Sequence, residues 1–376
     1  MHLLLLHHMK PVAYTAPRIF TGSEWLQHHA LIVNGGIIEA VVPATEINKN
    51  EYDVKPFAEG FLAPAFIDIQ IYGAADKLLA VHPTTEALQA LADYCLAGGA
   101  TLCIPTVATN SVEVFKQCID AVRAYWAAGG KGVYGLHLEG PWINKEKRGA
   151  HVDQYIHAPD LNEVKDLLQY GQDVIKVITL APEVCSSDVI EWIQGQNIII
   201  SAGHSNATYD EATAAFNSGI TTATHLYNAM SPLQHRKPGL VGALFNHPAA
   251  RCSIIPDGHH VDYAAIAIAK KQMGERLFVI TDAVTSTTSG HYQHQLDGDK
   301  YVCNGTLSGS ALTMHKAFQN LVEHAGIGID EALRMCSLYP AQVIRQAHQW
   351  GKLQPGYRAE AIVLNNQLEL QHVINA

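Results

Sequence analysis

The chain has 376 residues, of which 48% are hydrophobic and 16% charged, and its formal net charge is -10. This length and hydrophobic content suffice for one large domain with a smaller one beside it. The acidic balance argues against a nucleic-acid partner, which selects a basic surface, and against a polybasic membrane-binding patch.

The N-terminal stretch MHLLLLHHMK contains too few apolar residues for a secretory signal and lacks a small-residue cleavage site. No apolar run approaches the roughly 20 residues that a membrane-spanning helix needs. The seven cysteines are scattered singly, without a CxxC pair, which is typical of a reducing compartment. We therefore expect a cytoplasmic protein rather than a secreted disulfide protein.

Short strands are predicted at both ends of the chain. The stretch ALIVNGGIIEAVVP indicates a strand, a turn at Gly35 and Gly36, and a second strand. The tail also predicts short strands, broken by Pro355 and Gly356. Neither end could bury a core alone. We therefore predict that residues 1–60 and 346–376 meet in one small β-sandwich domain.

Between these ends, residues 61–345 alternate short apolar runs with longer amphipathic ones. The apolar runs are rich in Val, Ile and Thr, and most lack polar alternation in their first half, as strands buried on both faces do. They are 66–73, 101–109, 132–140, 174–182, 197–205, 221–229, 251–259 and 277–283. Helices are predicted between them, for example at 85–99, 112–130, 210–219 and 262–274. Eight strand-then-helix units predict a (β/α)8 TIM-type barrel.

Ionisable residues close five of these apolar runs: His137 with Glu139, His204, His225, His259 with His260, and Asp282. In such a barrel the active site forms at the C-terminal ends of the strands. One histidine at a strand end is more often structural than a ligand, but burying several ionisable groups in one ring suggests a shared cation or reaction. A Glu with two His suits Zn²⁺ or a neighbouring divalent metal. A carboxylate on the last strand could then take a proton from a metal-bound water.

Two polar loops follow these strands, GPWINKEKRGAH at 140–151 and HLYNAMSPLQHRKPG at 225–239. The first is long enough to fold over a substrate, although its charged residues also suit a solvated loop. In the second, Asn228 and Arg236 could form an anion site, because the planar Arg fork suits phosphate or carboxylate. A lone loop Arg is usually solvated, so this signal alone leaves both interpretations open.

Seven motifs resemble those of the N-acetylglucosamine-6-phosphate deacetylase family in the amidohydrolase superfamily. In chain order they are LHLEGP, GHSNAT, THLYNAM, HRKPG, PDGHHVD, VITDA and GTLSGSALTM. The resemblance covers the whole predicted barrel, and the two ends suit that family's small β domain. It implies a metal-dependent enzyme that hydrolyses N-acetyl-D-glucosamine 6-phosphate to D-glucosamine 6-phosphate and acetate.

The resemblance also implies residue roles. Glu139, His204 and His225 match the metal ligands, and Asp282 matches the catalytic acid/base. The matching substrate contacts are Ala150, His151, Asn228, Ala229, Arg236, His260, Leu307 and Ser308. His260 is preferred to His259 because the family pattern has one His before Val-Asp. One divalent metal per subunit is implied, Zn²⁺ first and Fe²⁺, Co²⁺ or Mn²⁺ as alternatives, together with a homodimer whose second subunit contributes to phosphate binding.

The first predicted barrel strand departs from the pattern of two-metal relatives, which carry two histidines where this chain has Gln70 and Tyr72. Alternate residues of a strand share a face, so both side chains point the same way as Asp68. A Gln amide is a poor ligand but can bond a metal-bound water, which predicts a single tightly held metal. One-metal members usually have Asn at the second position. We predict that the larger Tyr72 packs at the site edge and bonds toward water or substrate.

Three other functions remain open on the sequence. A deacetylase of N-acetylgalactosamine 6-phosphate would differ in its substrate by the configuration of one hydroxyl. A cyclic-amide hydrolase would carry two histidines on the first strand and a modified Lys at the end of the fourth, whereas Lys176 lies in that strand's first half. A non-catalytic sugar-phosphate sensor would not need Asp282 beside a complete ligand set.

Overall fold

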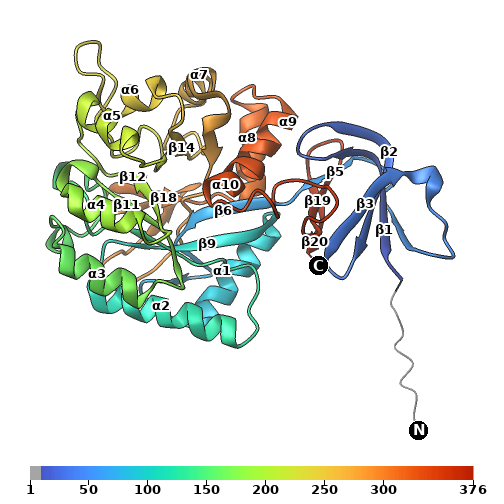
Figure 1. The fold of residues 1–376 in the computed structure, drawn as a ribbon, viewed down its shortest axis with the longest axis horizontal. Helices are drawn as coiled ribbons and strands as arrows, with labels where there is room; N and C mark the ends of the chain where they lie inside the picture. The colour runs from blue at the N-terminus through green and yellow to red at the C-terminus, as the bar shows by residue number, and fades with distance from the viewer. Residues whose placement is uncertain (1–9, 376) are drawn as a thin grey trace, which may run out of the picture.

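The computed structural model describes residues 10–375, so the N-terminal leucine run at 3–6 lies outside the described residues. Two main units are visible in Figure 1, a barrel wrapped in helices and a small sheet at its side. In the described part of the chain, no helix is long and apolar enough to cross a membrane. All seven cysteines are free.

The barrel is a parallel sheet whose eight strands follow one another in chain order. They are β6 (Phe66–Ile71), β9 (Ala100–Ala108), β10 (Leu136–Glu139), β11 (Ile175–Leu180), β12 (Ile199–Ala202), β13 (Thr222–Ala223), β14 (Arg251–Ile254) and β15 (Leu277–Val279). Each lies within a predicted run, except that β9 begins one residue before its run. Most of their residues are buried on both faces, which explains why the sequence shows apolar runs without alternation. The predicted (β/α)8 barrel is confirmed.

The first and last strands close the barrel beside the candidate site. Asp282 N donates to Gln70 O at 3.0 Å, and Tyr72 N donates to Ala283 O at 2.9 Å. The Asp68 carboxylate reinforces this closure, because it accepts from the backbone N–H of Thr281 at 3.3 Å. The eighth strand therefore presents its carboxylate next to the first strand.

Ten helices occur among the described residues, most of them after the strands as predicted. They are α1 (Thr85–Ala97), α2 (Val112–Ala127), α3 (Leu161–Tyr170), α4 (Ser187–Gln194), α5 (Tyr209–Asn217), α6 (Gly239–Asn246), α7 (Tyr263–Met273), α8 (Met314–Glu323), α9 (Ile329–Cys336) and α10 (Leu338–Val343). Side-chain caps begin several of them, such as Thr84 on α1 and the Thr208–Glu211 capping box on α5. Gly98 ends α1 as the sequence predicts.

The small domain draws its strands from both chain ends, as predicted. It is one mixed sheet built from β1 (Val12–Phe20), β2 (Trp25–Asn34), β3 (Ile37–Pro43), β4 (Asp53–Pro56), β5 (Phe61–Pro64), β19 (Glu360–Leu364) and β20 (Leu370–Asn375). Ile37 of β3 bridges to Arg358, next to β19, so the sheet curls around its own buried cluster. The boundary at residue 60 remains a prediction, and β5, just beyond it, pairs with β1 and β19.

Two short antiparallel sheets complete the described structure. One pairs β7 (Gly73–Ala74) with β8 (Lys77–Leu78), and the other contains β16 (Gln295–Asp297), β17 (Lys300–Cys303) and β18 (Thr306–Ser310). Ser310 N donates to Asp282 O at 2.9 Å, and Val284 N donates to Ser310 O at 3.1 Å. The second sheet is thereby attached at the mouth of the barrel, beside the end of the eighth strand.

Candidate metal centre and active site

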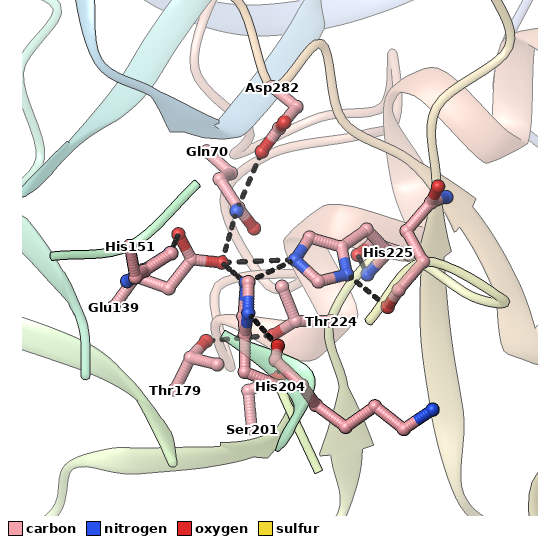
Figure 2. A network of polar contacts seen from close by, with 12 residues as sticks. Gln70, Glu139, His151, Thr179, Ser201, His204, Thr224, His225 and Asp282 are labelled. Carbon is pink, nitrogen blue, oxygen red and sulfur yellow. Dashed lines mark hydrogen bonds and ion pairs between the residues drawn. The ribbon is translucent and has the colours of Figure 1, made fainter. Parts of the chain in front are cut away.

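The candidate ligands and the candidate base all lie at C-terminal strand ends. Glu139 is the last residue of β10, His204 and His225 follow β12 and β13 by two residues, and Asp282 follows β15 by three. All four side chains are buried. Figure 2 shows Glu139, His204, His225 and Asp282 pointing toward one centre, with Gln70 between the two carboxylates.

Left-handed backbone turns aim three of these side chains. His204, His225 and Asp282 have φ values of 47°, 42° and 55°. A non-glycine residue in this region costs about 1–2 kcal/mol. Such strain is retained where the surrounding structure fixes it and often marks a functional site. Each strand therefore ends in a bend that directs an ionisable side chain inward instead of continuing the sheet.

The ring orientations of the two histidines are fixed by backbone carbonyls. His204 Nδ1 lies 2.8 Å from Lys147 O, and His225 Nδ1 lies 3.1 Å from Asn228 O. A carbonyl oxygen can only accept, so Nδ1 carries the hydrogen and a neutral ring offers its Nε2 lone pair. Both Nε2 atoms face Glu139, and they lie only 3.1 Å from each other. Converging lone pairs beside a carboxylate form a donor set for a cation.

The spacing of this donor set suits a tetrahedral metal. Glu139 Oε1 lies 3.3 Å from His204 Nε2 and 3.1 Å from His225 Nε2. Metal–ligand bonds of about 2.0–2.1 Å in a tetrahedron place ligand atoms about 3.3 Å apart. The site fits one Zn²⁺-sized ion on geometry and on donor type, with room for a non-protein ligand.

His151 offers an alternative third donor, since a grouping of Glu139, His151 and His204 also falls within 4.8 Å. However, His151 Nε2 lies 3.1 Å from the other carboxylate oxygen, Oε2. We favour His225 as the third ligand, because its Nε2 and that of His204 share the same oxygen. His151 then lies beside the centre, with Nδ1 bonded to Thr109 Oγ1 at 2.7 Å.

Burial and neighbouring charges separate the two carboxylates chemically. Burial disfavours ionised Glu139, but His204, His151 and His225 outweigh it and hold the pKa of Glu139 well below its usual range. Burial raises the pKa of Asp282; the Glu139 charge adds to this and His225 opposes it. One carboxylate is thus kept as an anion suited to a cation, and the other binds a proton more readily than a surface aspartate.

Gln70 and Tyr72 both reach this centre from the first strand. Gln70 Nε2 lies 2.8 Å from Asp282 Oδ1 and 3.0 Å from Glu139 Oε1, so its amide holds the two carboxylates. The Tyr72 hydroxyl donates to Glu139 Oε2 and lies 2.8 Å from Gln70 Nε2. The prediction that Tyr72 packs at the site edge is therefore wrong. Strand alternation predicts the right face, but the phenol is long enough for its oxygen to reach the carboxylates of Glu139 and Asp282.

A cavity opens above the centre and receives seven of the eight predicted substrate contacts: Ala150, His151, Asn228, Ala229, His260, Leu307 and Ser308. Arg236 does not line this cavity. It is exposed in a tight turn closed by reciprocal backbone bonds between Gln234 and Lys237. The chain therefore brings together the substrate contacts that the resemblance implies, with the exception of Arg236.

Some residues near the site were not predicted. Tyr292 and His294 are buried in the cavity wall, with His294 Nδ1 2.9 Å from Ser308 Oγ. Asp257 holds His260 Nδ1 at 2.6 Å. The only sequence signal for Tyr292 and His294 is their alternate spacing, which weakly predicts a strand in an otherwise polar segment. Asp257 could have been found as the acidic residue three positions before a candidate histidine.

His137, two residues before Glu139 on β10, is held by a backbone carbonyl and a chain of hydroxyl groups. His137 Nδ1 faces Ile69 O at 3.2 Å, so its Nε2 accepts from Thr179 Oγ1 at 2.7 Å. Thr179 in turn contacts Thr224, which contacts Ser201, as Figure 2 shows. Burial lowers the pKa of His137 to about 4. The surroundings of His137 therefore favour its neutral ring.

We expect His137 to destabilise the protein in acid. Its folded pKa lies below the unfolded value of about 6.5, so its contribution is complete above pH 6.5 and is lost as the pH falls through 4. The loss is about 3 kcal/mol for a shift of about 2.5 pKa units. Unfolding free energies of wild type, His137→Asn and the exposed-site control His372→Asn, measured from pH 7 to 4, test this. Equal slopes in wild type and His137→Asn would contradict it.

Comparison with known proteins places the chain in a family. Residues 61–375 match the amidohydrolase family, and residues 12–54 match the NagA composite domain. N-acetylglucosamine-6-phosphate deacetylase of Haemophilus influenzae is 34% identical over 95% of this chain and 96% of its own length. N-acetylgalactosamine-6-phosphate deacetylase of Escherichia coli O157:H7 is 31% identical over 95% of this chain and 96% of its own length.

Solved structures agree with these sequence matches. The crystal structure of N-acetylglucosamine-6-phosphate deacetylase from Pasteurella multocida has a TM-score of 0.92 at 34% identity, covering 97% of this chain and 98% of its own. The Mycobacterium smegmatis enzyme, solved as an aspartate-to-alanine mutant in complex with N-acetyl-D-glucosamine-6-phosphate, has a TM-score of 0.87 at 27% identity, covering 98% of both chains. The chain therefore belongs to the amidohydrolase family and, within it, to the metal-dependent NagA-type deacetylases.

Proposed function

We propose that this protein hydrolyses N-acetyl-D-glucosamine 6-phosphate to D-glucosamine 6-phosphate and acetate. The convergence of Glu139 Oε1, His204 Nε2 and His225 Nε2 within 3.1–3.3 Å, next to Asp282, carries the proposal. The Haemophilus influenzae and Pasteurella multocida relatives have this activity in their names, and the Mycobacterium smegmatis relative is a complex with this sugar phosphate. A cytoplasmic location is proposed with it, on the seven free cysteines.

Glu139, His204 and His225 would hold one divalent metal, which when bound would lower the pKa of a water and polarise the acetamide carbonyl. Asp282 accepts the proton of the water that attacks the carbonyl carbon. Asp282 then donates the proton to the amine nitrogen as the C–N bond breaks, so the carboxylate is regenerated. Gln70 holds Asp282 in place from the first strand. His151 lines the same cavity, and in this proposal its ring is the contact for the acetyl group.

The rest of the cavity orients the sugar. His260 is fixed by Asp257, and Ser308 contributes from β18. Asn228, in the loop that begins at the proposed ligand His225, also lines the cavity. Holding the sugar at several points converts attack on the amide into an intramolecular step.

The phosphate needs a cation, and we propose that a second subunit supplies it. Among residues 10–375, no Lys or Arg lines the cavity. Arg236 is exposed outside it, in the loop that begins at His225. A twofold dimer could present Arg236 of one subunit to the cavity of the other. The bidentate fork of Arg suits a phosphate dianion.

This arrangement predicts complementation between two defective proteins. Arg236→Gln should raise KM about 10- to 100-fold, as expected for the loss of a charged hydrogen bond. Hybrid dimers of Arg236→Gln with Asp282→Asn, isolated with two different tags, contain one site with both intact residues. They should recover about half of the wild-type activity, because one of the two sites of a twofold dimer is complete. Hybrids no more active than their parents, or a monomer in solution, would exclude a partner-supplied Arg236.

N-acetylgalactosamine 6-phosphate is the second candidate substrate, favoured by the 31% identity to the Escherichia coli O157:H7 enzyme. Purified protein with stoichiometric Zn²⁺ should be assayed for acetate release from both sugar phosphates. We expect a higher kcat/KM for the gluco substrate. A higher value for the galacto substrate would replace the proposal. Binding without acetate release from either compound would favour the sensor function.

A further inference from the structure

The two oxygens of Glu139 have different surroundings. Oε1 faces the Nε2 atoms of His204 and His225 at 3.3 and 3.1 Å. Oε2 points the other way, toward the Tyr72 hydroxyl and His151 Nε2. Glu139 is nearly fully buried. The surrounding side chains, and not solvent, therefore determine which of its two oxygens faces the metal site.

Tyr72 is the residue that can donate a hydrogen bond to Glu139 Oε2 at neutral pH. A phenol has an ordinary pKa of about 10 and carries one hydrogen. Gln70 Nε2, 2.8 Å away, is an amide donor and cannot accept this hydrogen, which remains free for a carboxylate. Glu139 Oε2 is its nearest carboxylate, since Asp282 Oδ1 lies at 3.4 Å.

His151 is not equivalent to Tyr72 at this oxygen. The Thr109 hydroxyl donates to Glu139 O at 3.2 Å, so it accepts from His151 Nδ1 at 2.7 Å. The hydrogen of a neutral His151 ring therefore sits on Nδ1, and its Nε2 has only a lone pair to offer. In that state His151 cannot donate to Oε2, and the bond from Tyr72 has to hold the carboxylate.

We propose that Tyr72 is a positioning residue that holds Glu139 as a one-oxygen metal ligand. Its hydroxyl engages Oε2 and leaves Oε1 alone facing the ion, while the Gln70 amide spans Glu139 and Asp282. Coordination positions that a two-oxygen Glu139 would occupy then stay available for water and for the substrate carbonyl. The inference rests on the proposed metal site, but its test uses the metal alone and needs no substrate.

The test compares wild type with Tyr72→Phe, which keeps the ring and removes the hydroxyl. Apoprotein is titrated with Co²⁺ in competition with a chromophoric chelator, and the visible spectrum is recorded. We expect about 10-fold weaker Co²⁺ binding, the lower end for loss of an outer-shell partner of a metal ligand. We also expect a weaker visible band, because released Glu139 binds through both oxygens and the intense spectrum of a four-coordinate ion is lost.

A matched control is Tyr292→Phe, which removes a phenol from the same cavity. The Tyr292 hydroxyl donates to Thr109 O at 2.6 Å and accepts from Val152 N at 3.4 Å, and neither partner is a candidate ligand. This variant should bind Co²⁺ with the wild-type affinity and spectrum. An unchanged affinity and spectrum in Tyr72→Phe would overturn the proposal and leave Tyr72 as a packing residue.

A crystal structure of the metal-loaded wild type provides a second test that does not depend on a variant folding. It should show Glu139 Oε2 within hydrogen-bond distance of Tyr72 and outside bonding distance of the ion. Two-oxygen coordination by Glu139 would overturn the proposal, even if the protein deacetylates the sugar phosphate. If the acetate-release assay failed, the Co²⁺ titration and the metal-loaded crystal structure would still test the role of Tyr72, because neither uses the substrate.

Discussion

Asp282→Asn is expected to lower kcat about 10³-fold, within the range for loss of a general acid–base group. An amide cannot take the proton of the attacking water or return it to the leaving amine. The side chain is buried beside Gln70, and Asn preserves its shape, so the structural cost is small. Because burial raises the pKa of Asp282, the native carboxyl is suited to both halves of this transfer.

Steady-state kinetics and elemental analysis of the same samples check this prediction. The metal content of Asp282→Asn should match that of wild type, since Asp282 is not among the three proposed ligands. Asp297→Asn, at an exposed position on β16, is a matched control and should retain full activity. Turnover within a few-fold of wild type in Asp282→Asn would remove this residue from catalysis. A parallel loss of metal would make it a ligand instead.

Metal removal is the second change with a large expected effect. Dialysis against a chelator should reduce activity at least 10³-fold, because water near its ordinary pKa of 15.7 is then the only nucleophile. One equivalent of Zn²⁺ per subunit should restore it. Binding to the folded state alone should also raise the free energy of unfolding, by about 4 kcal/mol at a free metal concentration 1,000-fold above Kd.

A ligand variant separates loss of the metal from loss of the fold. His225→Asn shortens the side chain and removes the Nε2 donor, so it should lack tightly bound metal and stay inactive at one equivalent. Its unfolding midpoint should match that of wild-type apoprotein, because both lack the ion. Full activity in chelator-treated wild type, or a normal metal content in His225→Asn, would contradict the assigned ligand set.

The barrel was predictable because its strands are buried on both faces. Runs such as 66–73 and 101–109 stand out as continuous apolar stretches, and β6 and β9 lie within or one residue beyond them. The ionisable residues were predictable for a related reason. A histidine or carboxylate at the end of an apolar run stands out from the apolar residues before it, and barrel geometry brings such strand ends together.

Contacts across the barrel were harder to predict. Periodicity placed Tyr72 on the correct face, but the distance from its hydroxyl to Glu139 depends on how strands β6 and β10 are arranged in the closed barrel. The three-stranded sheet β16–β18 gave little signal, since Gln295–Asp297 are all exposed and no apolar face repeats there. The pairing of β5 with the small domain was also missed, because FLAP runs directly into the apolar first barrel strand.

Acetate release from N-acetyl-D-glucosamine 6-phosphate, followed while Zn²⁺ is titrated into the apoprotein, tests the central claim most directly. The claim is that one metal held by Glu139, His204 and His225 serves a deacetylase. Activity should rise linearly and stop at one equivalent per subunit, with glucosamine 6-phosphate formed in equal amount. A plateau at two equivalents, or no acetate at any metal content, would contradict the account.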